Sequence, residues 1–400
     1  MSKDTKPAYA DVMSNRALAP FGTTIFSEMT AAALEHQAIN LSQGFPDFNG
    51  PQGIMEAAQK ALSQGHNQYA RSMGHPALVE AVANHVKTNY QIDVAPYEEV
   101  CTFSGATEGI AAFLLGYLNP GDEVILFAPF YDSYQAVAAL AGAKVKTYFL
   151  QPPNFELDLN LLESLITPKT KLLLLNSPHN PTGKVFTKEE MTDISELVKK
   201  YDLTVLSDEV YEHLTYDGAQ HIPFCSLPNM WERTFTLSST GKTFSFTGWK
   251  IGWGYGPPHL AQAGLRAHQF LTFCAATPLQ VAMAHALNNY QESYLAELKS
   301  EYLERRNILA QGLALAGFEV FMPKGTYFLL ADFSRHSKSP DRVFAHQLTQ
   351  EAKVATVPPS VFYPQDERTP KHLLRFAFCK QKSTMEEAVQ RLSQWAKKTA

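Results

Sequence analysis

Short apolar runs alternate with helical patterns through the middle of the chain. Four of these runs have the length of buried strands: residues 124–127, 172–175, 203–206 and 234–237. Amphipathic segments lie between them, for example at residues 131–143 and 188–201. Strands that alternate with helices indicate a mainly parallel sheet covered on both faces. The pattern therefore predicts an α/β fold.

The two ends of the chain have a different pattern. Residues 23–38 predict a helix with Thr23 or Thr24 as its cap, after a polar arm or frayed end at residues 1–19. Near the C-terminus, a long charged helix, two strand-like segments and a final helix are expected at 290–316, 326–333, 373–378 and from about 383. This shift predicts three regions along the chain: residues 1–45 as an arm and part of a small domain, 46–289 as a large ligand-binding domain, and 290–400 as a small α+β domain.

Composition excludes several classes of protein. The chain has 400 residues, of which 45% are hydrophobic and 18% charged, which is an ordinary globular balance. A net charge of −5 gives no electrostatic reason to expect nucleic acid. The four cysteines form no CxxC pair, the 13 histidines show no metal-site spacing, and no apolar run is long enough to span a membrane. We expect a cytoplasmic protein without a metal site.

Polar side chains follow the predicted strands at their carboxyl ends, where open α/β sheets bind ligands. Tyr131 follows the first of the four runs, Asn180 the second, Asp208 and Tyr211 the third, and Lys242 the fourth. Phenol, amide, carboxylate and amine groups would therefore converge on one edge of the sheet. This set fits a flat, polar heteroaromatic cofactor that carries an anionic group.

Lys242 and Asp208 have the chemistry that such a cofactor needs. A neutral lysine amine forms a Schiff base with an aldehyde and later acts as a general base. A buried carboxylate keeps a pyridine nitrogen protonated, which makes the ring an electron sink. Asp208 has an alternative interpretation as a helix N-cap, whereas Glu209 would point to the other face of the strand and be structural.

The segment from Ser104 to Gly109 is a small-residue turn that opens a helix, which is a ready anion site or simply a capped helix. Ser239 and Lys250 would add a hydroxyl and a cation for a phosphate. A single lysine is usually a solvated surface cation, but the glycines and tryptophans around Lys250 argue against that here.

Five motifs resemble those of one family. The segments SSTGKTFSFTGWKIG (238–252), NSPHNPTG (176–183), SDEVY (207–211), LSQGFPDF (41–48) and LRF (374–376) resemble, in the right order, the motifs of class I/II aminotransferases of fold type I. The likeness runs from about residue 20 to the C-terminus. It implies a mostly parallel seven-stranded sheet, pyridoxal 5′-phosphate (PLP) as the cofactor, and a homodimer.

The details resemble one branch of that family. Lys250 stands where many members have arginine, and with the QGFPDF loop it resembles the kynurenine/glutamine aminotransferases. The nearest likeness is to the bacterial methionine aminotransferases, which residues 24–26, 131–134 and 359–362 favour. Cys274 stands near a position where some kynurenine aminotransferases have histidine, which argues against a preference for kynurenine.

The resemblance assigns roles to individual cofactor-binding residues. Lys242 would carry the cofactor, Asp208 would pair with the ring nitrogen, Tyr211 and Asn180 would bind the ring oxygen, and Tyr131 would stack on the ring. The phosphate would be held by Gly105, Ala106, Thr107, Ser239 and Lys250, together with Tyr69 of the neighbouring subunit.

The substrate carboxylate would be bound by Arg375, assisted by Gly44 and Asn180, although Arg375 could also be an ordinary strand arginine. Four aromatic residues would line the side-chain pocket, or else belong to the plain core: Phe26, Tyr69, Phe273 and Phe362. His179 is the one histidine expected near the cofactor.

The predicted function is therefore a homodimeric PLP-dependent aminotransferase. It would pass the amino group of methionine, or of another sulfur-containing, glutamine or aromatic L-amino acid, to a 2-oxo acid by a ping-pong route. One alternative is a β-lyase acting on cysteine conjugates, and another is a kynurenine–oxoglutarate aminotransferase. A PLP-sensing module without turnover would add a DNA-binding helix-turn-helix, for which the chain leaves no room before residue 40.

Overall fold

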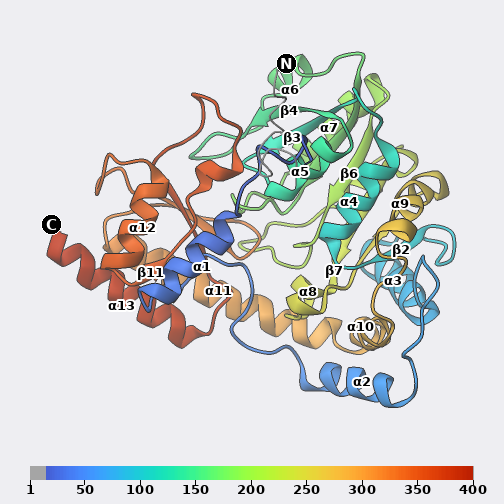
Figure 1. Cartoon of the computed structure of the whole chain (residues 1–400), viewed down its shortest axis with the longest axis horizontal. Helices are drawn as coiled ribbons and strands as arrows, with labels where there is room; N and C mark the ends of the chain where they lie inside the picture. The colour runs from blue at the N-terminus through green and yellow to red at the C-terminus, as the bar shows by residue number, and fades with distance from the viewer. Residues whose placement is uncertain (1–14, 400) are drawn as a thin grey trace, which may run out of the picture.

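A seven-stranded sheet forms the centre of the molecule (Figure 1). The computed structural model describes residues 15–399, so most of the expected N-terminal arm lies outside the described residues. The strand order is β2-β8-β7-β6-β5-β3-β4. The strands are β2 (Val100–Phe103), β3 (Glu123–Ala128), β4 (Lys144–Phe149), β5 (Thr170–Asn176), β6 (Thr204–Asp208), β7 (Thr234–Ser239) and β8 (Gly252–Tyr255). Only β8 runs antiparallel to its neighbours, which confirms the mostly parallel α/β fold.

Helices cover both faces of this sheet because its central strands are apolar on both sides. In β5, Leu172 and Leu174 belong to one buried core, whereas Leu173 and Leu175 belong to another. The first core lies under α4 (Ala106–Tyr117), α5 (Asp132–Leu140) and α9 (Pro258–Leu271), and the second under α6 (Leu159–Ser164) and α7 (Lys188–Lys200). A third core joins the β2–β8 edge to α2 (Gln52–Ser63), α3 (Pro76–Tyr90) and α10 (Thr277–Asn289).

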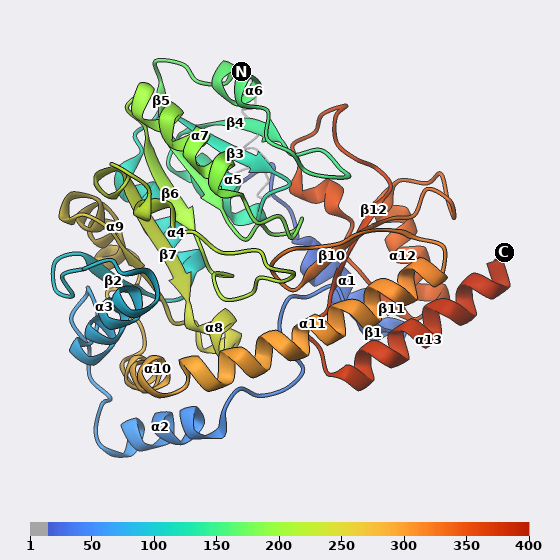
Figure 2. The same ribbon diagram turned by 180° about the vertical axis from the view of Figure 1, so that it is seen from behind.

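A second group of elements combines the N-terminal and C-terminal segments. Strand β1 (Ile39–Asn40) pairs with β11 (Val354–Ala355), and β9 (Glu319–Phe321), β10 (Phe328–Asp332) and β12 (Leu373–Ala377) form an antiparallel sheet. These strands share a core with α1 (Ile25–Glu35), α11 (Gln291–Leu315), α12 (Asp341–Glu351) and α13 (Lys382–Thr399). Figure 2 shows α11 running from α10 toward this group.

The helices expected near both ends are confirmed as α1, α11 and α13. Thr24 is the N-cap of α1, because its side chain accepts a hydrogen bond from the Ser27 N–H group at 3.4 Å. The division of the chain at residues 45 and 289 stays a prediction. Among the helices that the structure describes, none is long and apolar enough to cross a membrane.

Candidate active site

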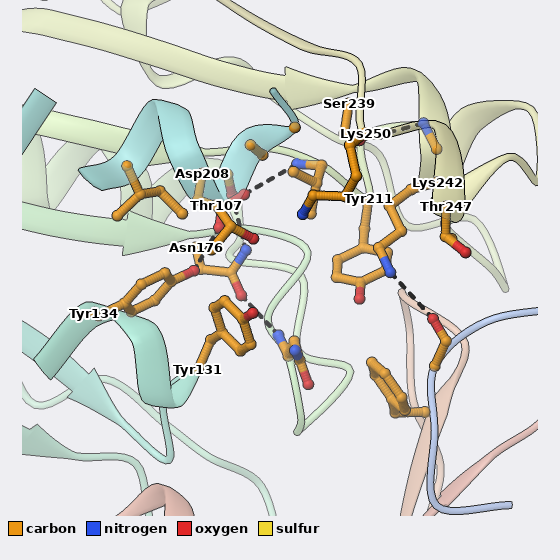
Figure 3. Close-up of a pocket in the computed structure, with 18 of the residues that line it drawn as sticks. Thr107, Tyr131, Tyr134, Asn176, Asp208, Tyr211, Ser239, Lys242, Thr247 and Lys250 are labelled. Atoms are coloured by element: carbon orange, nitrogen blue, oxygen red, sulfur yellow. Dashed lines mark hydrogen bonds between the residues drawn. The ribbon is translucent and has the colours of Figure 1, made fainter. Parts of the chain in front are cut away.

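The carboxyl ends of the parallel strands open into a pocket between the central sheet and the C-terminal group of elements (Figure 3). The structure brings most of the predicted site residues together in its lining: Phe26, Gly44, Gly105, Ala106, Thr107, Tyr131, Asn180, Asp208, Tyr211, Ser239, Lys242, Lys250 and Arg375. These residues come from eleven separate positions along the chain, counting Gly105–Thr107 as one. The convergence follows from parallel strands, whose carboxyl ends meet at one edge.

Lys242 lies on the short helix α8 (Thr240–Thr243), directly after β7. Ser239 caps this helix by accepting a hydrogen bond from the Gly241 N–H group at 3.2 Å. The Lys242 Nζ donates to the Gly44 carbonyl oxygen at 3.1 Å and to the Tyr327 hydroxyl at 2.6 Å. Burial lowers the pKa of Lys242 to about 8, so a fraction of the amine is neutral near neutral pH. A neutral amine is what a nucleophilic lysine requires.

Asp208 is the last residue of β6, so its alternative interpretation as a helix N-cap is not supported. Its carboxylate accepts hydrogen bonds from the Tyr134 hydroxyl and from the Val210 N–H group at 3.3 Å. Burial raises the pKa of Asp208 to about 6, and in the described chain this residue makes no salt bridge. A protonated ring nitrogen would supply the cationic partner that this buried carboxylate lacks.

Glu209 directly follows β6 and is absent from the pocket lining. Its carboxylate accepts hydrogen bonds from the Ser207 hydroxyl at 2.6 Å and from the Phe224 N–H group at 3.1 Å, and it lies 2.8 Å from the His221 Nε2. Glu209 therefore links the end of β6 to the following loop.

Two glycines shape a cradle for an anion at the N-terminus of α4. Gly105 has a φ of 81°, and a Cβ there would lie 3.1 Å from the Lys250 Nζ. A Cβ on Gly252 would lie 2.6 Å from the Ala106 nitrogen, so only glycine fits against this turn. A phosphate bound here could accept hydrogen bonds from the N–H groups of the first helical turn and from the Ser239 hydroxyl. The Lys250 ammonium would add a positive charge.

Arg375 lies on β12 and is 1% exposed. Its Nη1 donates to the Asn180 Oδ1 at 3.2 Å and its Nη2 to the Ser42 carbonyl oxygen at 2.7 Å, whereas its Nε has no partner within the described chain. Burial lowers its pKa to about 10, which still leaves it charged at neutral pH. A buried cation with an unsatisfied donor fits a bound carboxylate better than an ordinary strand position.

Aromatic rings surround this guanidinium. The Arg375 Cζ lies 4.0 Å from the Phe328 ring centroid, 5.3 Å from that of Phe26 and 5.2 Å from that of Phe362. Phe26 lines the pocket, but Phe362 packs behind it, 5.9 Å from Phe26 between ring centroids. Both rings thus shield the arginine from water.

Tyr69 and Phe273 do not line the pocket of their own chain. They lie on the surface, 83% and 46% exposed, with their ring centroids 5.2 Å apart. His179 is also absent from the lining. It is 1% exposed, lies 2.8 Å from the Thr182 hydroxyl through its Nδ1, and has a pKa that burial lowers to about 3.

Seven residues of the pocket lining were not assigned from the sequence: Ile110, Tyr134, Asn176, Val210, Gly241, Thr247 and Phe328. Tyr134 lies one helical turn beyond Tyr131 on α5, a spacing that could have indicated it. Asn176 accepts a hydrogen bond from the Asn180 N–H group at 2.8 Å and donates to the Asp208 carbonyl oxygen at 2.8 Å, which ties two site loops together. Phe328 gave no signal, because its approach depends on the tertiary fold.

A separate buried cluster lies beside the loop that carries Tyr211. His85, Glu212 and His213 offer possible metal-ligand atoms within 4.8 Å of one another, which the sequence spacing did not predict. The Glu212 carboxylate already accepts hydrogen bonds from the Tyr90 and Ser238 hydroxyls and lies 3.4 Å from the His85 Nε2. Hydrogen bonding alone therefore accounts for this carboxylate.

The raised pKa of Asp208 predicts a measurable effect on stability. In the protein free of ligand, the Asp208 carboxyl binds its proton more tightly in the folded state than in the unfolded state. Loss of this proton therefore lowers the free energy of unfolding as pH rises through about 6. We expect Asp208→Asn to remove this cost, which amounts to about 1 kcal/mol between pH 5 and pH 8. Urea unfolding of both proteins at the two pH values measures it. An equal difference between the proteins at both values would contradict the assignment.

Comparison with known proteins agrees with this geometry. The family model for aminotransferase class I and II matches residues 36–392. A probable N-succinyldiaminopimelate aminotransferase of Mycobacterium tuberculosis is 42% identical over 97% of this chain and 100% of its own length. The methionine aminotransferase of Escherichia coli is 40% identical over 96% of this chain and 100% of its own. A kynurenine–oxoglutarate transaminase of Dictyostelium discoideum is 37% identical over 92% of this chain and 93% of its own.

Solved structures agree in fold. That of the Escherichia coli methionine aminotransferase superimposes with a TM-score of 0.92 at 40% identity, covering 96% of this chain and 100% of that one. That of the Mycobacterium tuberculosis N-succinyldiaminopimelate aminotransferase gives a TM-score of 0.93 at 42% identity, with 96% and 100% covered. The chain belongs to the class I and II aminotransferase family, whose members depend on PLP.

Proposed function

We propose that this aminotransferase takes the amino group of methionine, or of another sulfur-containing, glutamine or aromatic L-amino acid, and passes it to a 2-oxo acid. The observation that carries the proposal is the charge of the pocket lining. Its cationic side chains among the described residues are Lys242, Lys250 and Arg375, and each has a proposed task on the cofactor or the substrate carboxylate. The remaining wall includes Phe26, Val210 and Phe328, which suit an uncharged side chain.

The protein groups have complementary tasks in this proposal. Bound PLP supplies the electron sink for the substrate carbanion. Asp208 keeps the ring nitrogen protonated, while Tyr211 and Asn180 donate to the ring oxygen. Arg375 would hold the substrate carboxylate, and the Lys242 Nζ would take the proton from the substrate α-carbon and release it again within the same half-reaction. With the incoming 2-oxo acid, Lys242 would run this proton exchange in reverse. The lowered pKa of Lys242 supports this task, because the amine can both accept and release a proton near neutral pH.

A substrate panel tests the proposal. We expect the amino-acid half-reaction, followed by the loss of cofactor absorbance in a stopped-flow instrument, to be faster with methionine than with aspartate in kcat/KM. The panel also includes kynurenine and N-succinyldiaminopimelate, which appear in the names of two relatives. Glutamine and phenylalanine represent the other proposed donor classes. Faster turnover of aspartate with 2-oxoglutarate would overturn the assignment. Release of pyruvate and ammonia from S-substituted cysteine, in place of amino transfer, would favour the β-lyase alternative.

We also propose a homodimer in which Tyr69 reaches the phosphate of the neighbouring subunit and Phe273 its side-chain pocket. Support comes from an apolar surface around these residues, where Phe270 and Leu271 are 86% and 49% exposed. Exposed aromatic patches of this kind mark interfaces. The free thiols of Cys101, Cys225, Cys274 and Cys379 favour a reducing compartment such as the cytoplasm.

Subunit complementation tests the shared site. Mixed dimers of Tyr69→Ala and Lys242→Ala subunits contain one intact site each, because one subunit supplies Tyr69 and the other Lys242. We expect the mixture to recover activity with the wild-type KM, whereas the Lys242→Ala dimer stays inactive and the Tyr69→Ala dimer binds PLP weakly. A mixture that is no more active than the Tyr69→Ala parent would contradict a site shared between subunits.

A further inference from the structure

A buried phenol next to Lys242 has no task in the proposed function so far. Tyr327 lies directly before β10, is 1% exposed, and accepts a hydrogen bond from the Lys242 Nζ. We propose that Tyr327, together with the Gly44 carbonyl group, is a positioning residue that fixes the direction in which the Lys242 amine exchanges its proton. This inference rests on the proposed role of Lys242 in amino transfer.

The three polar atoms form a closed triangle. The Lys242 Nζ lies 2.6 Å from the Tyr327 Oη and 3.1 Å from the Gly44 carbonyl oxygen, and the Tyr327 Oη lies 2.6 Å from the same carbonyl oxygen. A carbonyl oxygen can only accept, so the Tyr327 O–H group donates to Gly44. The lone pairs of the Tyr327 oxygen are thereby left for Lys242. Both contacts of the amine are therefore made by its own N–H groups.

This arrangement determines what the amine can do. A neutral amine has two N–H groups and one lone pair, and here both N–H groups are engaged. The third direction on nitrogen therefore holds the lone pair in the neutral form and a third N–H group in the charged form. Only this direction is left to accept a proton and to give it back. Without Tyr327, the amine keeps one acceptor and can rotate about its side-chain bonds.

The backbone holds Tyr327 in place under strain. Thr326 has a φ of 65°, and a β-branched residue in this left-handed region is a genuine outlier. Its N–H group donates to the Leu214 carbonyl oxygen at 2.9 Å, and its carbonyl oxygen accepts from the Tyr216 hydroxyl at 2.7 Å. Strain of this kind persists only where the surroundings over-determine it, and it clusters at functional sites.

The loop on the other side of the triangle is also fixed. A Cβ on Gly44 would lie 2.9 Å from the Tyr327 ring and 2.5 Å from the Phe328 ring, so the Gly44 backbone is pressed against β10. The Tyr327 ring centroid lies 5.2 Å from that of Tyr211 in an edge-on contact. Tyr327 is therefore packed between the Gly44 loop and the loop that carries Tyr211, with its hydroxyl directed at Lys242.

Tyr327→Phe tests the inference, because it removes the hydroxyl and keeps the ring. Tyr302→Phe is the matched control: Tyr302 is also 1% exposed, its ring centroid lies 6.0 Å from that of Tyr327, and it makes no hydrogen bond to Lys242. The first measurement uses protein stripped of cofactor. Acetic anhydride labels Lys242 over a range of pH, and mass spectrometry of its peptide gives the pKa of the amine.

We expect the pKa of Lys242 to fall in Tyr327→Phe, because the charged amine loses an acceptor, and to stay unchanged in Tyr302→Phe. In the enzyme loaded with PLP, we expect kcat for methionine to fall about 100-fold in Tyr327→Phe, with KM unchanged. Deuterium at the methionine α-carbon should then slow the variant more than it slows the wild type, since proton transfer becomes more rate-limiting.

A Tyr327→Phe protein whose Lys242 pKa and isotope effect equal those of the wild type would overturn the inference. So would equal losses of kcat in Tyr327→Phe and Tyr302→Phe, which would mean that Tyr327 only fills the core. The labelling measurement needs no amino-acid substrate. A shifted pKa in a protein that transfers no amino group would therefore contradict the proposed function and leave the positioning of Lys242 standing.

Discussion

The burial of one amine is the constraint on which this site depends. Lys242 lies in a pocket where desolvation holds its pKa near 8, far below the usual range for lysine. The sheet makes this possible, because parallel strands bring Asp208 and Lys242 to one edge while helices on both faces exclude water. The same burial raises the pKa of Asp208 to about 6 and lowers that of Arg375 to about 10. Burying any of these three charged groups without a partner costs free energy. A bound molecule of opposite charge would offset that cost.

The pocket accordingly contains polar groups that lack a partner of opposite charge or a hydrogen-bond acceptor. Asp208 has hydrogen-bond donors but no cation, and the Arg375 Nε has no acceptor in the described chain. Lys250 lies beside the N-terminus of α4, because a Cβ on its N-cap Gly105 would lie 3.1 Å from the Lys250 Nζ. A cofactor with a basic ring nitrogen and a phosphate, followed by a substrate carboxylate, would satisfy all three. Binding would therefore stabilise the folded chain as well as prepare it for reaction.

Much of this could be predicted from the sequence, for physical reasons. The apolar runs are strands because they are buried on both faces, and the polar residues after them converge because the strands are parallel. The positions of Lys242, Asp208 and Asn180 in the pocket follow from that rule alone. Helices α11 and α13 and strands β10 and β12 were also predictable, since their periodicity is local, whereas α12, β9 and β11 were not predicted.

Other features depend on tertiary packing and left no local signal. Tyr327, which contacts Lys242, follows Thr326, whose left-handed conformation is one that its residue type disfavours. Phe362 was expected to line the substrate pocket, but it packs behind Phe26 and around Arg375. The His85–Glu212–His213 cluster joins α3 to a loop more than a hundred residues away. Tyr69 and Phe273 lie on the surface, so the role proposed for them requires a second copy of the chain.

The most direct test of the central claim is chemical identification of the lysine that carries the cofactor. Borohydride reduction of the PLP-loaded enzyme links the cofactor permanently to its lysine, and mass spectrometry of the digested protein then locates it. We expect the phosphopyridoxyl group on Lys242 and on no other lysine. Its attachment to Lys250, or to any other lysine while Lys242 stays unmodified, would contradict the account.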